Sequence, residues 1–177
     1  MNNNLEIVLQ KIIVTTRGDK TVKQRFLQRL KQGNLLKADN EKSHYCVFFL
    51  PYSSKAKKIF LVHHKKADKW IPPGGHIEKG ELPTNTLTRE LQEELGYTLN
   101  KQNMPKPFLL TRVFINNSFP CNEHLDIWYA VETPTDAFVV DPSEFYDTRW
   151  VSFDEAEKLS ADKNTLNALK IFSNLQG

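Results

Sequence analysis

Strand-like and helix-like stretches alternate along this chain, and their order limits the folds it can adopt. Apolar runs typical of strands span residues 44–50, 59–64, 108–115, 124–132 and 149–153. Apolar residues at helical spacing mark residues 5–13, 22–30, 83–95, 154–159 and 164–175. Interleaved strands and helices predict an α/β or α+β domain, in which helices cover a sheet.

The composition is that of an ordinary globular domain. The 177 residues are 40% hydrophobic and 25% charged, which excludes a disordered, collagen-like or disulfide-scaffold chain. Cys46 and Cys121 form no Cys-x-x-Cys pair. No apolar stretch approaches the roughly 20 residues that span a bilayer, and the start lacks the features of a signal peptide. We therefore expect a cytoplasmic protein with no membrane contact.

The first 40 residues differ from the rest in charge. They carry eight Lys or Arg and three acids, against 16 and 18 in the remainder. A second basic stretch spans residues 55–69, yet neither reaches the concentrated stripe of a nucleic-acid binder, so a solvated lysine-rich face is favoured. The two N-terminal helices each have one apolar stripe, which must dock on the main domain or on a partner chain. We predict a helical extension at 1–40 and a domain at 41–177, with a homodimer contact or a lid as alternative roles for the extension.

The helix predicted at 83–95 carries Glu90, Glu93 and Glu94 beside its apolar stripe. Like charges at i,i+4 cost an isolated helix about 0.2–0.5 kcal/mol per pair. A hard cation removes that cost, and Mg²⁺ or Mn²⁺ prefers carboxylate ligands and shares its shell with substrate phosphates. Taken alone, the three glutamates favour an ordinary acidic helix face. Together with the residues that surround them in the sequence, they predict a Mg²⁺ (or Mn²⁺) site for phosphoryl chemistry.

The spacing around this helix resembles the Nudix box, GX5EX7REUXEEXGU, in which U is a bulky apolar residue. The matching fixed residues are Gly75, Glu81, Arg89, Glu90, Glu93, Glu94 and Gly96, with Tyr97 at the last U position, where an aliphatic residue is more usual. A chance match has odds of ~10⁻⁸ per start position. The resemblance implies an α/β/α sandwich around a mixed sheet, with the N-terminal 40 residues outside the shared core.

The resemblance also implies an activity and a set of roles. Nudix proteins typically hydrolyse a nucleoside diphosphate linked to another moiety, by metal-assisted attack of water on phosphorus. By this resemblance Glu90, Glu93 and Glu94 bind the metal together with the Gly75 carbonyl. Arg89 is then expected to pair with Glu81 in a structural role.

The general base stays open between a box glutamate and an acid on a later loop. Glu144 lies in the loop before the strand predicted at 149–153, at a place where many members contribute such a glutamate, and Asp147 is a second candidate. Trp70 and His76 flank the Pro-Pro-Gly-Gly entry and are candidate substrate contacts, although a packed aromatic and a surface histidine are the favoured interpretations.

Other groups carry weaker signals. Phe114, Phe119 and Trp128 are candidates to line a nucleoside pocket, with core packing favoured for each. Adjacent histidines, such as His63 and His64, point to opposite faces of a strand and do not share a metal. The Cys121–His124 spacing suggests half of a zinc site, but no second pair completes it in the sequence.

The leading hypothesis is a metal-dependent pyrophosphohydrolase. Its substrate would be a small nucleotide derivative: an NTP, an oxidised NTP, a nucleotide sugar or a dinucleotide. The proline that follows the box in ADP-ribose-type members and the upstream signature of coenzyme A-type members are both missing, so the base and leaving group stay open. The alternatives are a non-catalytic Nudix-fold module that senses a nucleotide or docks a protein, and a diphosphate isomerase.

Overall fold

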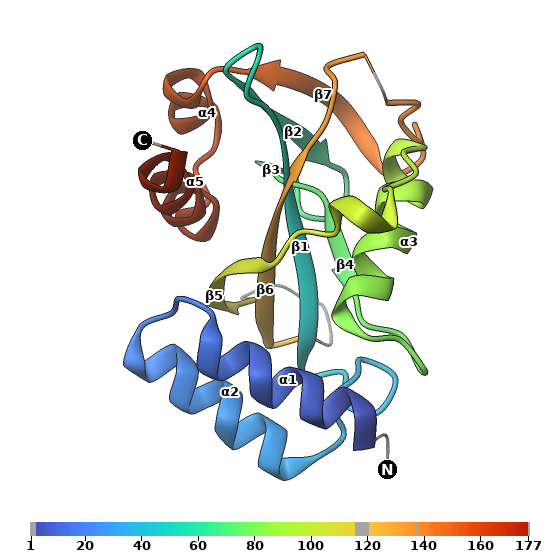
Figure 1. Cartoon of the computed structure of the whole chain (residues 1–177), viewed down its shortest axis with the longest axis vertical. Helices are drawn as coiled ribbons and strands as arrows, with labels where there is room; N and C mark the ends of the chain where they lie inside the picture. Colours follow the sequence, from blue (N-terminus) through green and yellow to red (C-terminus); the bar gives the residue numbers. More distant parts are fainter. Residues whose placement is uncertain (1–2, 116–120, 137, 177) are drawn as a thin grey trace.

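The computed structural model describes residues 3–115, 121–136 and 138–176. Its helices are α1 (Asn3–Thr15), α2 (Lys20–Gln32), α3 (Pro83–Leu95), α4 (Phe153–Leu159) and α5 (Lys163–Gln176), with a 3-10 turn η1 (Lys101–Asn103). Its strands are β1 (Ser43–Ser53), β2 (Lys58–His64), β3 (Lys69–Ile71), β4 (Gly74–His76), β5 (Pro107–Phe114), β6 (Glu123–Glu132) and β7 (Phe145–Val151). The expected α+β architecture is confirmed (Figure 1).

Strand β1 is the centre of a mixed sheet with the order β3-β2-β1-β6-β5. One edge of β1 pairs in parallel with β6 along ten residues. The other edge is shared: residues 46–48 pair antiparallel with β4, and residues 52–53 pair antiparallel with β2. The predicted pairing of the first two strands is therefore correct but short, because the glycine strand β4 occupies half of that edge.

The two faces of the sheet are covered differently. One face packs against α1 and α3, where Leu9, Leu87 and Leu91 are fully buried in the largest hydrophobic cluster. The opposite face packs against α4 and α5 through a second cluster that contains Leu50, Leu169 and other apolar residues. Figure 1 shows α3 on one side of the sheet and α4 with α5 on the other.

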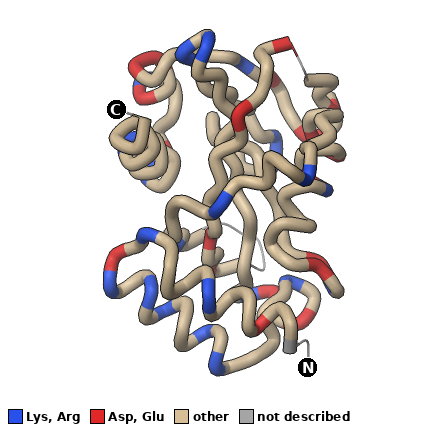
Figure 2. Tube along the Cα trace, viewed as in Figure 1, with Lys and Arg blue, Asp and Glu red and all other residues tan. Residues whose placement is uncertain are grey.

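The N-terminal helices dock on the main domain. Phe26 of α2 is fully buried in the same cluster as the leucines of α3. Arg25 donates to Glu123 at 2.5 Å and thereby ties α2 to β6. Five Lys or Arg lie along α2, whereas α1 contains only Lys11 (Figure 2). The division into 1–40 and 41–177 and the homodimer contact stay predictions.

The final strand begins earlier than the sequence predicted. It runs from Phe145 to Val151, because Phe145 is buried and extends the pairing with β2 past a bulge between His63 and His64. Asp147 therefore lies within β7, and its predicted position in a loop is wrong. No helix in the described part of the chain is long and apolar enough to cross a membrane.

Candidate functional site

Helix α3 has the boundaries that the sequence predicted. Pro83 occupies its first turn, where a missing N–H costs nothing. Gly96 ends it in the left-handed conformation with φ 61°, which glycine adopts without the penalty of a Cβ. Burial of the leucine stripe fixes the helix rotation, so that Glu90 and Glu94 are buried at the sheet and Glu93 is exposed.

Strand β4 passes directly against the two buried glutamates. A Cβ added at Gly75 would overlap Glu90 Oε1, so only glycine permits this approach. The Gly74 amide donates a hydrogen bond to Glu94 Oε2 at 3.2 Å. A Cβ at Gly74 would instead overlap the Val47 carbonyl oxygen of the neighbouring strand. The paired glycines thus allow β4 to pack against β1 and α3 together.

Arg89 is the counter-ion of the acidic helix face. Its Nε donates to Glu81 at 2.7 Å, the pair that the resemblance implied. Its Nη1 also donates to Glu90 at 2.8 Å and to Glu93 at 2.9 Å, and its Nη2 donates to the His76 carbonyl at 3.0 Å. One guanidinium therefore joins the helix, the loop that precedes it and strand β4.

Glu94 differs from its neighbours because no cation pairs with it in the described part of the chain. Burial, followed by repulsion from Glu90, raises the pKa of Glu94 well above its usual value. Burial also raises the pKa of Glu90, although Arg89 opposes the shift. Buried carboxylates that repel one another are a suitable environment for a hard divalent cation. Among the described residues, the glutamates of α3 do not form a group of three ligand atoms within 4.8 Å of one another.

The two candidate acids near β7 have different surroundings. Glu144 immediately precedes β7 and is partly buried, with its carboxylate 3.2 Å from Lys66 Nζ. Its charge contributes to the raised pKa of Glu94, so the two carboxylates interact. Asp147 is exposed and pairs with Arg149 at 2.8 Å. The Asp141 amide donates to the Glu94 carbonyl oxygen at 3.0 Å, so the loop that contains Glu144, and not Asp147, contacts the acidic helix.

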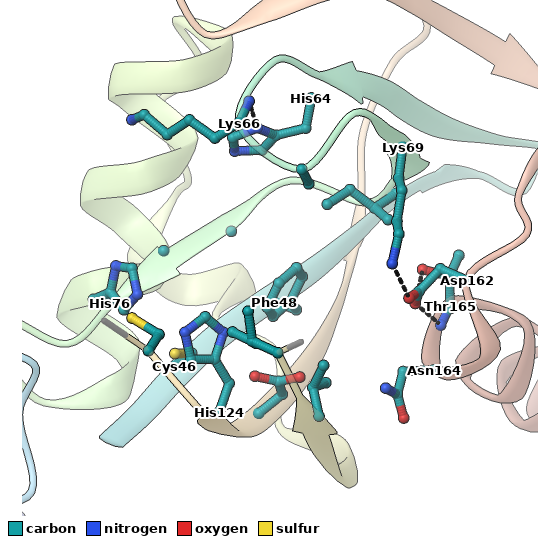
Figure 3. A pocket seen from close by; sticks show the side chains of 18 of the residues that line it. Cys46, Phe48, His64, Lys66, Lys69, His76, His124, Asp162, Asn164 and Thr165 are labelled. Atoms are coloured by element: carbon teal, nitrogen blue, oxygen red, sulfur yellow. Dashed lines mark hydrogen bonds and ion pairs between the residues drawn. The ribbon is translucent and has the colours of Figure 1, made fainter. Parts of the chain in front are cut away.

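A cavity of about 430 Å³ opens beside these glycines (Figure 3). Gly74 and Gly75 form part of its wall, and Lys66 and Lys69 line it as well, 3.2 Å from Glu144 and 3.8 Å from Asp162 respectively. Most of its residues come from the sheet, from the turn between β2 and β3, and from the chain around the start of α5. None of the described lining residues belongs to α3, so the acidic helix meets the cavity only through Gly74 and Gly75, which contact Glu94 and Glu90.

The aromatic residues that the sequence offered as candidate nucleoside or substrate contacts differ in whether they line this cavity. Trp128 stacks on Phe48 with ring centroids 5.2 Å apart, and both line the cavity. Phe114 also lines it and is 63% exposed, whereas Phe119 lies outside the described residues. Trp70 is not among the described residues that line the cavity. It stacks on His63, with ring centroids 5.3 Å apart.

Sequence reasoning missed a cluster at one end of the cavity. His44 and His76 lie with the suggestive pair Cys121 and His124, and the four offer ligand atoms within 4.8 Å of one another. The expectation that no second pair completes the Cys121–His124 group is wrong, because strand pairing brings His44 and His76 beside it from distant parts of the chain. Burial, followed by neighbouring His and Lys charges, lowers the pKa of His76 and of His124 to about 3, so His76 is not an ordinary surface histidine.

Comparison with known proteins gives a consistent set of likenesses. A family model of the NUDIX domain matches residues 20–173. The ADP-ribose pyrophosphatase of Bacillus subtilis (strain 168) is 31% identical over 144 residues, which cover 78% of this chain and 75% of that protein. The m7GpppN-mRNA hydrolase NUDT17 of Xenopus laevis is 32% identical over 85 residues, which cover 44% of this chain but only 29% of that protein.

Solved structures of NUDIX hydrolases also have a similar fold. A NUDIX family hydrolase from Clostridium perfringens superposes with a TM-score of 0.57 at 24% identity, covering 75% of this chain and 97% of that chain. The match shows a shared fold.

Proposed function

This chain belongs to the Nudix family of hydrolases, and from that premise we propose that it is a metal-dependent pyrophosphohydrolase of small nucleotide derivatives. The bond cleaved would be a phosphoanhydride in a nucleoside diphosphate linked to another moiety. The observation that carries the proposal is the buried Glu94, which has no paired cation among the described residues and lies against Gly74 at the wall of the cavity.

The acidic helix face would hold the metal. We assign the ligands to Glu90, Glu93 and Glu94 with the Gly75 carbonyl, and the ion to Mg²⁺ or Mn²⁺. Bound there, such an ion neutralises phosphate charge and makes water a better nucleophile. Because Arg89 already touches two of these carboxylates, it holds them beside β4.

Other residues would serve the substrate and the water. Glu144 is the candidate second acid, because its loop contacts α3 where the Asp141 amide donates to the Glu94 carbonyl oxygen, and its charge acts on the Glu94 carboxylate. Lys66 and Lys69 line the cavity, each beside an acid, and would offset phosphate charge there. The partly buried Phe48, which stacks on the buried Trp128, and the exposed Phe114 offer apolar surface for a nucleoside.

The substrate class stays broad within this proposal. The names of the two relatives describe hydrolysis of ADP-ribose and of capped mRNA, so members of similar sequence differ in leaving group. The cavity volume of about 430 Å³ suits a nucleoside rather than a polymer. We therefore favour NTPs, oxidised NTPs, nucleotide sugars and dinucleotides.

Product release from a panel of these nucleotides and ADP-ribose tests the proposal. Each substrate is assayed with Mg²⁺, with Mn²⁺ and with EDTA, using wild type, Glu94→Gln and the exposed control Glu157→Gln. We expect metal-dependent cleavage that falls about 1,000-fold in Glu94→Gln, equivalent to about 4 kcal/mol, and is unchanged in Glu157→Gln.

Two outcomes would contradict the proposal. Cleavage that persists in EDTA, or in folded Glu94→Gln, would remove the metal role of the acidic helix. Nucleotide binding by the folded wild type without turnover of any substrate would instead favour a non-catalytic sensing module.

A further inference from the structure

Three strands bring three histidines to one face of the sheet. His44 on β1 and His124 on β6 are direct neighbours in the parallel register. His76 on β4 pairs with Cys46, two residues further along β1 on the same face. The imidazole centroids are 4.8 Å apart for His44–His76, 4.9 Å for His44–His124 and 5.2 Å for His76–His124. Figure 3 shows His76, Cys46 and His124 together at one end of the cavity.

A thiol completes this group from outside the strands. Cys121 precedes β6, and its Sγ lies 3.9 Å from His44 Nε2. It is buried and forms no disulfide. One atom from each of the four side chains lies within 4.8 Å of the others. The four side chains thus surround a common point.

Hydrogen bonding directs the His44 ring into the cluster. Its Nδ1 lies 2.9 Å from the Asn40 carbonyl oxygen. A carbonyl only accepts hydrogen bonds, so Nδ1 carries the proton and Nε2 presents its lone pair toward Cys121. A backbone carbonyl on the far nitrogen is the usual outer contact of a metal-bound histidine.

The other two rings leave nitrogens unsatisfied. His76 Nε2 and His124 Nε2 are buried and have no hydrogen-bond partner among the described residues. A buried polar atom without a partner costs about 1–3 kcal/mol. A cation at the centre of the cluster would bind the lone pairs of His76 Nε2 and His124 Nε2, to which no described protein atom donates a hydrogen bond.

We propose that His44, His76, His124 and Cys121 bind a Zn²⁺ ion. Three imidazole nitrogens and one thiolate match the nitrogen and sulfur ligands that zinc prefers, with Zn–N of ~2.0–2.1 Å and Zn–S of ~2.3 Å in a tetrahedron. The ligand atoms need to close by roughly 1 Å to reach that geometry. Proton balance is simple, because the thiol loses its proton to solvent when sulfur binds the metal.

This site is chemically separate from the acidic helix. Magnesium prefers oxygen ligands, whereas the cluster offers nitrogen and sulfur. Four protein ligands leave no open coordination position, so the role is structural. The ion would fasten β4 and the chain before β6 to β1. Since β4 also contains Gly74 and Gly75, zinc would stabilise the strand that forms the cavity wall.

Cobalt substitution on the untagged full chain tests the proposal directly. The protein is stripped with a chelator, dialysed and titrated with Co²⁺, and then with Zn²⁺. We expect thiolate-to-cobalt charge-transfer absorption and intense tetrahedral d–d bands that saturate at about one equivalent and disappear when zinc displaces cobalt. Elemental analysis of protein isolated from zinc-supplemented cells should give about one zinc per chain.

Variants identify the ligands. Cys121→Ser should lose the charge-transfer band, and His124→Gln should weaken cobalt binding at least tenfold. Cys46→Ala controls for the other thiol near His124, and His63→Gln controls for a histidine of β2 outside the cluster; both should keep the bands. Circular dichroism of each metal-free variant establishes that it is folded.

Three results would overturn the proposal. The first is wild type that shows neither cobalt bands nor bound zinc. The second is folded Cys121→Ser that retains the charge-transfer band. The third is loss of that band in folded Cys46→Ala, which would transfer the thiolate to Cys46. The wild-type titration decides the matter even if a variant fails to fold, and none of these readouts depends on hydrolase activity.

Discussion

The acidic helix and the histidine cluster both use strand β4, but they assemble in opposite ways. The glutamates of α3 lie within five residues of one another, and a single helix places them. The histidine cluster draws on β1, β4, β6 and the chain before β6, and its His44 and Cys121 are 77 residues apart. The first arrangement is visible as a spacing in the sequence, whereas the second exists only after the strands pair.

The two regions also differ in charge. Arg89 balances part of the negative charge on α3, and Glu94 stays buried without a paired cation among the described residues. The histidine cluster contains imidazoles whose pKa values, about 3 for His76 and His124, keep them uncharged near neutral pH. An oxygen-rich anionic site and a neutral nitrogen–sulfur site should therefore select different metals.

The largest expected effects come from substituting the two glycines of β4, which should differ in whether stability or activity is lost. Gly74→Ala should destabilise the protein by about 3 kcal/mol, because its Cβ would overlap the backbone of Val47. Gly75→Ala should leave stability within about 1 kcal/mol but lower kcat about 100-fold, because its Cβ displaces the Glu90 carboxylate. Urea unfolding and steady-state kinetics on both variants check this. Equal effects of the two substitutions on stability and activity would contradict it.

Removing Arg89 should destabilise the acidic helix itself. Arg89→Met leaves Glu81, Glu90 and Glu93 without their shared partner, at a cost of about 3 kcal/mol. Arg89→Lys should cost roughly half as much, because lysine keeps the charge but not the forked geometry. Denaturation in EDTA measures both. An Arg89→Met protein as stable as wild type would show that the network contributes little.

A smaller, pH-dependent effect is expected where α2 meets the sheet. Burial raises the pKa of Glu123, but hydrogen bonds from Arg25, Ser43 and Arg112 outweigh it and hold the value at about 2. The folded pKa is below the unfolded value of about 4.3, so the stabilisation is present above that pH and lost as pH falls toward 2.

Glu123→Gln tests this directly. The variant should be less stable than wild type by about 2 kcal/mol at pH 7, and the difference should shrink below pH 4.5. Urea unfolding between pH 7 and pH 3 measures it, with the exposed Glu157→Gln as control. A difference that stays constant over this range would contradict the assigned pKa.

The smallest expected effects are the increases in Tm that Mg²⁺ and Zn²⁺ produce. Mg²⁺ at tenfold above its Kd should stabilise the protein by about 1.4 kcal/mol, raising Tm by about 3–5 °C. Cys121→Ser should keep the magnesium shift and lose the zinc shift, and Glu94→Gln should do the reverse. Differential scanning calorimetry of untagged protein measures these shifts. If both variants lose the same shift, the two regions are not separate metal sites.

Local rules were enough for the helix that bears the box. Pro83 and Gly96 bound it as the sequence predicted, and the leucine stripe sets which glutamates face the sheet. The expected Arg89–Glu81 pair also follows from a short spacing, and the structure contains it. Backbone preferences and helical periodicity act over a few residues, so a sequence expresses them directly.

Long-range pairing decided the rest. The sequence misplaces Asp147 because Tyr146 and Asp147 are both exposed and break the alternation that marks a strand, whereas pairing with β2 places both in β7. Glu144 became associated with Glu94 only through the fold. His44 and His76 joined Cys121 and His124 for the same reason, since strand register is set by burial across the whole sheet and not by neighbours in the chain.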